Sequence, residues 1–489
     1  MKKAHIMRGM DVIGLVLFAV VFLTVLVSSV QRNAHILWIL PVLFVLCFLL
    51  FRSKNLKTAF CCCFCVMCVV QLFLGYLLMV EYSTWDVYAV TKNAAALVNG
   101  EYVNRGYFAQ YPNNTAIMLL FALVFKITKV LFGSTSVWVL VILNIAAIDA
   151  AIIFSMKIIK LLVHEQAAFR MGILAACFAP YYLYVPICYT DTFSMPWIAA
   201  SLYYLLRIVY KGEDSKKNYL KLALVGVVIA LGSQLKGSVI IILIAALLCL
   251  FFRFPIKRFL PHAASLVAGV LVLSVVFNFA LDQSGLIEDE LYEAKQMPPT
   301  HWIMMGLTGR GNYNGDDVAF TSSFETYSEK QEATMEQIKV RLQEMGVGGF
   351  LSHVHKKATQ YTWNFGTCYA ARYLGEIGDA PILRNILHEF VLSKGKYSSE
   401  FYAMTQGIYL LIFGFAVAAY LRGILHPDES SFLLRVSLLG CLLFFMLWET
   451  HPRYILNYTL VMIMLASQQL EFVNEKIGRL VCLRRGDKG

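Results

Sequence analysis

The amino-acid sequence predicts an all-α polytopic membrane protein with about 12 to 13 transmembrane helices, outer-face juxtamembrane helices and one large outer loop. Hydrophobic residues make up 59% of the 489 residues and charged residues only 15%, whereas soluble domains are about 45 to 50% apolar. Basic residues form short clusters between long apolar runs, as expected of cytoplasmic membrane flanks. The net charge of +11 therefore points to a membrane protein, and we expect no nucleic acid as a partner.

A helix that crosses the membrane needs about 20 mostly apolar residues. The first apolar run follows the basic segment "MKKAHIMR" and is expected to act as a signal anchor. The candidate spans are 11–30, 35–51, 57–80, 113–132, 136–157, 168–187, 191–210, 219–235, 237–252, 262–281, 403–424, 433–449 and 453–472.

Basic clusters at both chain ends predict that both ends are cytoplasmic, which requires an even number of crossings. The candidate 113–132 is the weakest span because it carries Lys126 and Lys129, so a re-entrant or interfacial helix is expected there. If 113–132 does not cross, the segment 81–112 faces the outer compartment, and Asp191 lies at the outer end of its helix.

The chain is expected to have three parts. Residues 1–281 form an N-terminal transmembrane module with the first outer loop at 81–112. Residues 282–402 form a large extracytoplasmic loop with short helices, including "SEKQEATMEQIKVRLQEMG" (328–346) and an interfacial or buried helix at 348–366. Residues 403–489 supply the C-terminal transmembrane helices and a basic cytoplasmic tail.

Two acids border apolar spans, where ionisable groups are costly and therefore candidates for function. Asp86 follows the third span beside Trp85; the alternative is a solvated loop acid next to an interfacial tryptophan. Asp191 lies between Pro186 and Pro196, which suits a helix break that directs the acid into a cavity. A helix N-cap is the alternative for Asp191.

Two cations are candidates for binding an anionic ligand. Lys236 lies between two short apolar segments, and the alternative is a lysine that snorkels at a turn. Glu449, His451 and Arg453 occupy the turn between the last two spans. An arginine there can offer bidentate hydrogen bonds to a phosphate, or it can pair with Glu449.

The segment 298–324 combines an apolar front, which includes His301 and Trp302, with a glycine-rich back that precedes Asp316 and Asp317. Such a loop can bend over a ligand, and the alternative is a structural turn. Its spacing matches neither a Walker motif nor an EF-hand, so it predicts neither a phosphate cradle nor a calcium loop.

Taken in order, several segments resemble the membrane-embedded C-type glycosyltransferase superfamily over about residues 75 to 470. They are "TWDVYAVTKNAAALVNG", "YFAQYPNN", "YTDTF", "QLKGS", "HWIMMGL" and "ETHPRYI". The similarity is to bacterial relatives of the protein mannosyltransferases, and most of all to Gram-positive cell-surface glycosyltransferases that decorate wall polysaccharides or teichoic acids.

The resemblance implies roles for individual residues. Asp86 corresponds to an acidic residue of the first outer loop that is the catalytic base or organises the acceptor, and Asp191 corresponds to a second outer acidic residue. Lys236 and Arg453 correspond to the cations that bind the phosphate of the lipid donor. Family members often have paired acids in the first loop, but Trp85 precedes Asp86 here. Further substrate contacts are expected at Trp85, Tyr111, Asn113, His301, Trp302, Asp317 and His451.

The function that follows is an inverting hexosyltransferase in the cell membrane with an extracytoplasmic active site. It would move a sugar from a polyprenyl (undecaprenyl) phosphate donor to a hydroxyl of a cell-surface glycan or teichoic acid. No cofactor is required by the sequence, which leaves room for Mg²⁺ or Mn²⁺ between Asp86 and Asp191, since hard cations take oxygen ligands. The alternatives are a lipid-linked sugar transporter or flippase, or a polysaccharide polymerase.

Overall fold

The computed structural model describes residues 2–51, 55–78, 85–211, 217–375 and 382–486. Every regular element in these ranges is a helix, which confirms the predicted all-α class. Within them, eight helices are long and apolar enough to cross a membrane, and two shorter apolar helices accompany these. The polytopic class is therefore confirmed, while the number of crossings stays a prediction.

The helices follow one another along the chain in two halves. The first half comprises α1 (Lys2–Arg32), α2 (Ile36–Phe51), α3 (Leu56–Leu77), α4 (Asp86–Asn99), α5 (Arg105–Gln110), η1 (Pro112–Asn114), α6 (Thr115–Phe132), α7 (Val137–Leu162), α8 (Glu165–Ala176), α9 (Pro180–Leu183), α10 (Thr190–Phe193), α11 (Met195–Lys211), α12 (Lys217–Leu235), η2 (Gly237–Ile240) and α13 (Ile241–Arg253).

The second half contains the large loop and the last long helices. It comprises α14 (Ile256–Gln283), α15 (Asp289–Lys295), α16 (Pro299–Gly306), α17 (Gly315–Ser322), α18 (Tyr327–Lys356), η3 (Lys357–Thr362), η4 (Ala370–Tyr373), α19 (Ile382–Val391), α20 (Ser398–Leu425), α21 (Glu429–Leu447), η5 (Pro452–Tyr458) and α22 (Thr459–Gly486).

The expected single span at 168–187 is wrong, because the helix stops and restarts as α8 and α9. Pro180 opens α9, where a missing backbone N–H has no cost. The irregular backbone that follows is satisfied from α7, since the buried side chain of Asn144 donates to the carbonyl oxygens of Tyr184 (2.8 Å) and Val185 (2.9 Å). Non-helical backbone at membrane depth needs such partners.

The predicted helices of the large loop are confirmed, and they form one kinked element. The α18 helix begins with a capping box, in which Thr326 and Glu329 bond each other's backbone N–H groups. It kinks at Gly346, whose φ of 56° suits glycine, and this kink separates the two predicted helical segments. A short π-helical turn, η3, ends the element.

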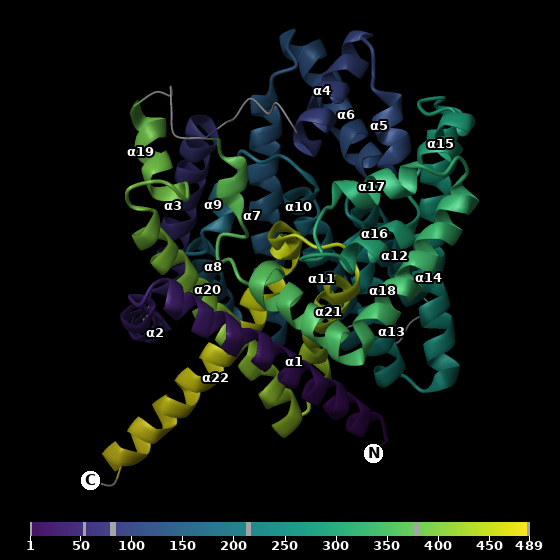
Figure 1. Cartoon of the computed structure of the whole chain (residues 1–489). Helices are drawn as coiled ribbons and strands as arrows, with labels where there is room; N and C mark the ends of the chain where they lie inside the picture. Colours follow the sequence, from purple (N-terminus) through teal and green to yellow (C-terminus); the bar gives the residue numbers. More distant parts are fainter. Residues whose placement is uncertain (1, 52–54, 79–84, 212–216, 376–381, 487–489) are drawn as a thin grey trace.

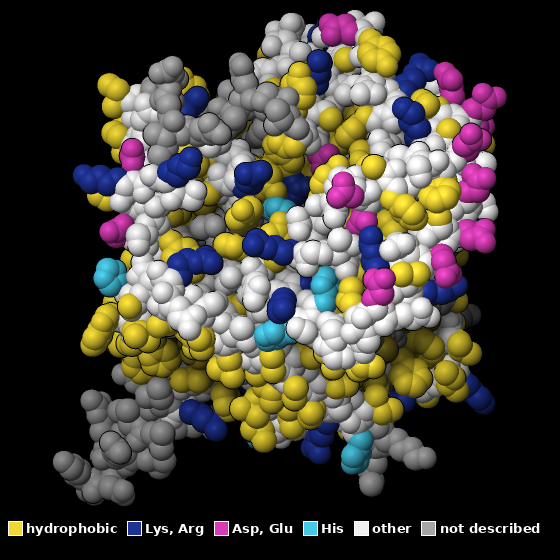
Figure 2. Space-filling model, in the orientation of Figure 1, with side chains coloured by type: hydrophobic (Ala, Val, Ile, Leu, Met, Phe, Trp, Pro, Cys, Tyr) yellow, Lys and Arg dark blue, Asp and Glu magenta, His cyan; other side chains and the backbone are white. Residues whose placement is uncertain are grey.

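Both chain ends lie on the side of the molecule opposite α4 and α5 (Figure 1), as an even number of crossings requires. Figure 2 shows most of the acidic side chains of this view on the α15 and α17 side and a few at the top and on the α19 side, all above a band of apolar side chains with Lys and Arg at its lower edge. The α6 helix is itself long and apolar enough to cross, so the expectation that 113–132 does not cross stays a prediction.

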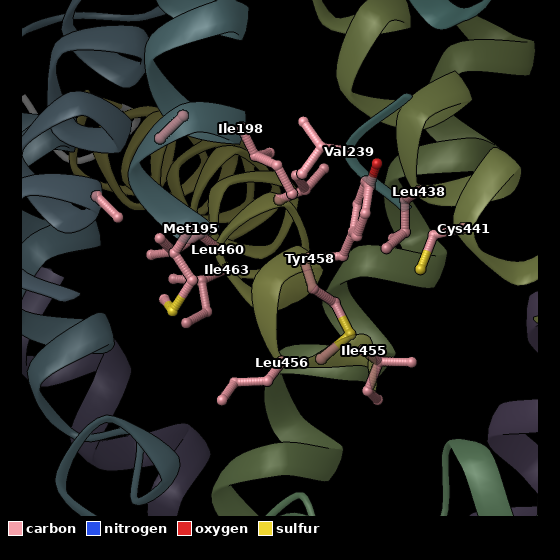
Figure 3. Close-up of a cluster of buried hydrophobic side chains, with 14 of the residues drawn as sticks. Met195, Ile198, Val239, Leu438, Cys441, Ile455, Leu456, Tyr458, Leu460 and Ile463 are labelled. Carbon is pink, nitrogen blue, oxygen red and sulfur yellow. The ribbon is translucent and has the colours of Figure 1, made fainter. Parts of the chain in front are cut away.

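Buried apolar side chains from five elements pack together in the centre of the molecule (Figure 3). Met195 and Ile198 come from α11, Val239 from η2, Leu438 from α21, Tyr458 from η5 and Leu460 from α22. Lipid tails are as apolar as these groups, so their close packing stabilises the fold mainly through van der Waals contact. This packing fixes η2, which follows Lys236, and η5, which carries Arg453.

Candidate active site

Four charged side chains from four separate segments meet at one place, and all four are residues that the sequence singled out. Lys236 forms an ion pair with Asp191. The guanidinium of Arg453 lies 3.7 Å from Oδ2 of Asp191 and 3.7 Å from Oδ2 of Asp86. Arg453 therefore lies between the two carboxylates.

Asp86 is the first residue of α4, and its carboxylate is oriented by a chain of hydrogen bonds. The hydroxyl of Tyr107 donates to Asp86 Oδ1 (2.7 Å), and the amide of Asn114 donates to Tyr107 (2.6 Å). The hydroxyl of Tyr189 in turn donates to Asn114 (2.6 Å). Asn114 is buried, whereas Asn113 is exposed, so the asparagine nearest to the acid is one position beyond the predicted one.

Asp191 and Lys236 are more deeply buried than Asp86. The N-cap of α10 is Tyr189, and the Asp191 side chain faces Lys236, so the N-cap alternative for Asp191 is wrong. Lys236 occupies the break between α12 and η2 with its side chain 11% exposed, so the snorkelling alternative is also wrong. The Asp191 side chain is 1% exposed, against 39% for Asp86, so Asp86 is the more accessible of the two acids.

Aromatic rings surround Arg453. Its guanidinium carbon lies 4.9 Å from the ring centre of Trp85, 5.1 Å from Tyr189, 5.3 Å from Tyr454 and 5.5 Å from Tyr373. Each distance is within the range of a cation–π contact. The rings fix the plane of the guanidinium and keep water away from its faces.

Arg453 keeps hydrogen-bonding capacity in this buried place. Its Nε and Nη1 atoms, and Oδ2 of Asp191, are buried and have no hydrogen-bond partner within the described residues. Buried donors without a partner are costly and need a specific explanation. The arrangement suits a guanidinium that donates to the oxygens of an anionic ligand.

Predicted aromatic contacts lie next to these charges. Trp85 packs on Tyr373 with ring centres 4.3 Å apart. Tyr111 packs against Tyr107, the partner of the catalytic candidate, at 5.4 Å, and Trp302 lies 6.2 Å from Tyr111. Trp302 thus brings the 298–324 segment to the edge of the site.

The backbone of the 298–324 segment also binds the linker between α21 and η5. The backbone N–H of Glu449 donates to the carbonyl of Trp302 (2.9 Å), and that of Thr450 donates to Gly311 (2.7 Å). Gly311 has a φ of 72°, a conformation that glycine adopts at little cost. The large loop therefore positions the segment that leads into Arg453.

Lys357 strengthens this attachment and was missed by the sequence reasoning. Its buried ammonium group donates to the carbonyl oxygens of Gly306 (2.9 Å) and Trp448 (2.6 Å). Burial lowers the pKa of Lys357 to about 7, and burial raises the pKa of the nearby Glu449 carboxyl to about 7. The sequence offers no signal that separates Lys357 from its exposed neighbour Lys356, because the difference depends on how the helix is rotated.

His451 supports Arg453 from the start of η5. Its Nδ1 accepts the backbone N–H of Arg453 (3.3 Å), so Nε2 carries the proton and faces the hydroxyl of Tyr373 (3.1 Å). Burial and the charge of Arg453 lower the pKa of His451 to about 2. The imidazole is therefore neutral and acts as a hydrogen-bonding group.

His301 and Asp317 lie in a second polar cluster within the large loop. His301 is fully buried, with Nδ1 2.7 Å from the hydroxyl of Thr321. Asp317 forms a bidentate pair with Arg341 of α18, at 2.5 and 3.1 Å. These contacts hold α16, α17 and α18 together, and the predicted substrate contacts of His301 and Asp317 stay predictions.

The divalent cation for which the sequence left room between the two acids stays a prediction. Arg453 lies between Asp86 and Asp191 and already supplies the positive charge there. In the described ranges, the side chains spaced as metal ligands are elsewhere, at His164, Glu471 and Glu475. No metal enters the mechanism proposed below.

Comparisons with known proteins place the chain among membrane proteins. A family model described as "conserved hypothetical integral membrane protein" matches residues 8–473. No curated protein matches the chain. Among solved structures, the archaeal oligosaccharyltransferase AglB from Archaeoglobus fulgidus, in complex with an inhibitory peptide and a dolichol-phosphate, is similar with a TM-score of 0.46 and 14% identity. The match covers 89% of this chain and 52% of AglB, so the chain spans about half the length of that protein.

Proposed function

Because the chain belongs to the family described as conserved hypothetical integral membrane protein, and because it gathers two acids and two cations between its membrane helices, we propose that it is a membrane-embedded glycosyltransferase. It moves a sugar from a polyprenyl phosphate to a hydroxyl acceptor. The observation that carries the proposal is Arg453, a buried guanidinium between a partly exposed and a buried carboxylate. Two of its nitrogen atoms have no hydrogen-bond partner among the described residues.

Arg453 binds the phosphate of the donor in this proposal. It offers donors in a fixed plane, which suits the oxygens of a phosphate. Lys236 adds positive charge, although its ammonium group is already paired with Asp191. As the sugar leaves, negative charge grows on the lipid phosphate, and a fixed cation in a water-poor site stabilises that charge without reorganising.

Asp86 is the base. It is the exposed member of the two acids, and the hydrogen bond from Tyr107 orients it. The acceptor hydroxyl gives its proton to Asp86 while its oxygen bonds to the anomeric carbon. The bond between that carbon and the phosphate oxygen breaks at the same time, and the phosphate keeps the electron pair. Attack on the face opposite the leaving group inverts the anomeric carbon, as it does in inverting glycosidases.

Asp191 acts as a positioning residue. Asp191 is 1% exposed and contacts both cations, so it holds Lys236 and Arg453 in place. The resemblance noted in the sequence extends the proposal to an undecaprenyl phosphate sugar as donor and to a wall glycan or teichoic acid as acceptor. The active site would then face the outside of the cell membrane.

The test uses the purified protein in lipid nanodiscs with a panel of undecaprenyl phosphate sugars and follows release of undecaprenyl phosphate. At least one sugar should be consumed, and Arg453→Lys should slow release by about 100-fold or more because the planar set of donors is lost. Arg310→Lys, which changes an exposed arginine of the large loop, is the matched control. Transfer of an intact lipid-linked sugar across a liposome membrane without release of lipid phosphate would show a transporter instead.

A further inference from the structure

A groove of about 540 Å³ lies between α11 and α12, away from the candidate active site. Its apolar walls are formed by Tyr204 and Ile208 of α11 and by Leu224, Val225 and Val228 of α12. Tyr204 is 40% exposed and Leu224 is 56% exposed, so the groove opens on the outside of the helix bundle. A groove of this kind on membrane helices faces lipid.

The groove lies toward the membrane face that carries the chain ends. Lys221 precedes Lys236 by 15 positions in the sequence, and α12 rises about 1.5 Å per residue, so the two lysines are about 22 Å apart along the helix axis. The chain then returns through α13, whose C-terminal end binds the N-terminus: Lys3 donates to the carbonyl oxygens of Phe251 (2.5 Å) and Phe254 (2.6 Å). The start of α12 and the N-terminus thus share one face.

Two cations, Arg207 and Lys221, line the same groove. No ion pair or hydrogen bond of either side chain is found in the part of the chain that the structure describes. The groove therefore combines an apolar wall with two cations that have no partner among the described residues.

We infer that this groove binds one anionic phospholipid from the leaflet on the side of the chain ends. An acyl chain would lie along the apolar walls, and the headgroup phosphate would contact Arg207 and Lys221. Basic pockets between transmembrane helices bind anionic headgroups on the cytoplasmic side, where anionic lipid is common. A zwitterionic lipid brings a positive group to the same cations, so it fits the charge of the groove less well.

The test is native mass spectrometry of the intact protein, titrated with phosphatidylglycerol or with phosphatidylcholine of the same acyl chains. We expect one phosphatidylglycerol to bind at least tenfold more tightly than phosphatidylcholine. The double variant Arg207→Gln/Lys221→Gln should weaken phosphatidylglycerol binding by about 25-fold, about fivefold for each cation. The control Lys57→Gln/Lys257→Gln removes the same charge from two exposed lysines outside the groove and should bind as the wild type does.

A second variant keeps the test decisive if the double variant does not fold. Val228→Trp fills the apolar wall of the groove without changing its charge, and it should displace the bound phosphatidylglycerol while the protein keeps its size-exclusion profile. Three results would overturn the inference: equal affinity for the two phospholipids, equal weakening by the control, or undiminished binding in Val228→Trp. Preferential binding of undecaprenyl phosphate that survives competition by phosphatidylglycerol would also overturn it, because the groove would then serve the donor lipid.

Discussion

Asp86→Asn is the substitution that tests the proposed base most directly. Asparagine has nearly the same shape as aspartate, and its carbonyl oxygen can still accept the hydrogen bond that Tyr107 donates to Asp86 (2.7 Å). The change therefore removes the negative charge and the ability to take a proton while it leaves the local geometry in place.

The structure separates the expected effect on activity from the effect on stability. The Asp86 carboxylate is 39% exposed and lies 3.7 Å from Arg453, so its ion pair is partly screened and worth about 1 kcal/mol or less. General base catalysis contributes about 100-fold to 10,000-fold in rate. We therefore expect a nearly unchanged melting temperature and a fall in transfer rate within that range.

The assay follows release of undecaprenyl phosphate from the sugar donor that the wild type consumes, at saturating donor concentration. Asp316→Asn is the matched control, because Asp316 is an exposed acid of α17 and undergoes the same chemical change. Wild-type turnover in Asp86→Asn would refute the assignment of the base. Equal loss in the control and in Asp86→Asn would show that the assay reports a general effect of charge.

Three further predictions concern stability, each measured by thermal or denaturant unfolding in detergent. Asp11→Leu should destabilise the protein by about 3 to 5 kcal/mol, because Asp11 accepts two hydrogen bonds from the buried Arg435, at 2.7 and 3.1 Å, and the substitution leaves that arginine without its partner. The double variant Asp11→Leu/Arg435→Met should recover most of the lost stability, and no recovery would contradict the pairing. Gly306→Ala should cost about 1 to 3 kcal/mol, since its Cβ would lie 2.4 Å from the carbonyl oxygen of the last residue of α21, whereas Gly348→Ala, which has open space around it, should cost less. Burial raises the pKa of Glu449 to about 7, so above about pH 4.5 the folded protein keeps a proton that the unfolded chain releases. The free energy of unfolding should therefore fall on the order of 3 kcal/mol as the pH rises from about 4.5 to 7. Glu449→Gln should remove this dependence of stability on pH, and an unchanged dependence would show that another group causes it.

The sequence predicted the class of the protein and the four charged residues of the candidate site for local reasons. Hydrophobic runs, basic flanks and helix signals are properties of neighbouring residues, so they can be read without knowing the fold. Charges at the ends of apolar segments stand out because burial there is costly. This reasoning identified four candidate site residues, Asp86, Asp191, Lys236 and Arg453, before any distance between them was known.

The local sequence pattern did not predict which residue is buried where the direction of the side chain decides this. Neighbours such as Asn113 and Asn114, or Lys356 and Lys357, have the same chemistry, and only the rotation of their helices exposes one and buries the other. The break within 168–187 likewise depends on Asn144, a residue of another helix.

By itself, the sequence determined that this chain is an all-helical membrane protein with ionisable groups at the ends of its apolar segments. The tertiary structure decided that Arg453 lies between two carboxylates and that Asp86 is the more exposed of these. It also decided that Arg207 and Lys221 line one groove. The physical reason is that distances between segments far apart in the chain depend on how whole helices pack, and helix packing is a property of the complete set of contacting surfaces.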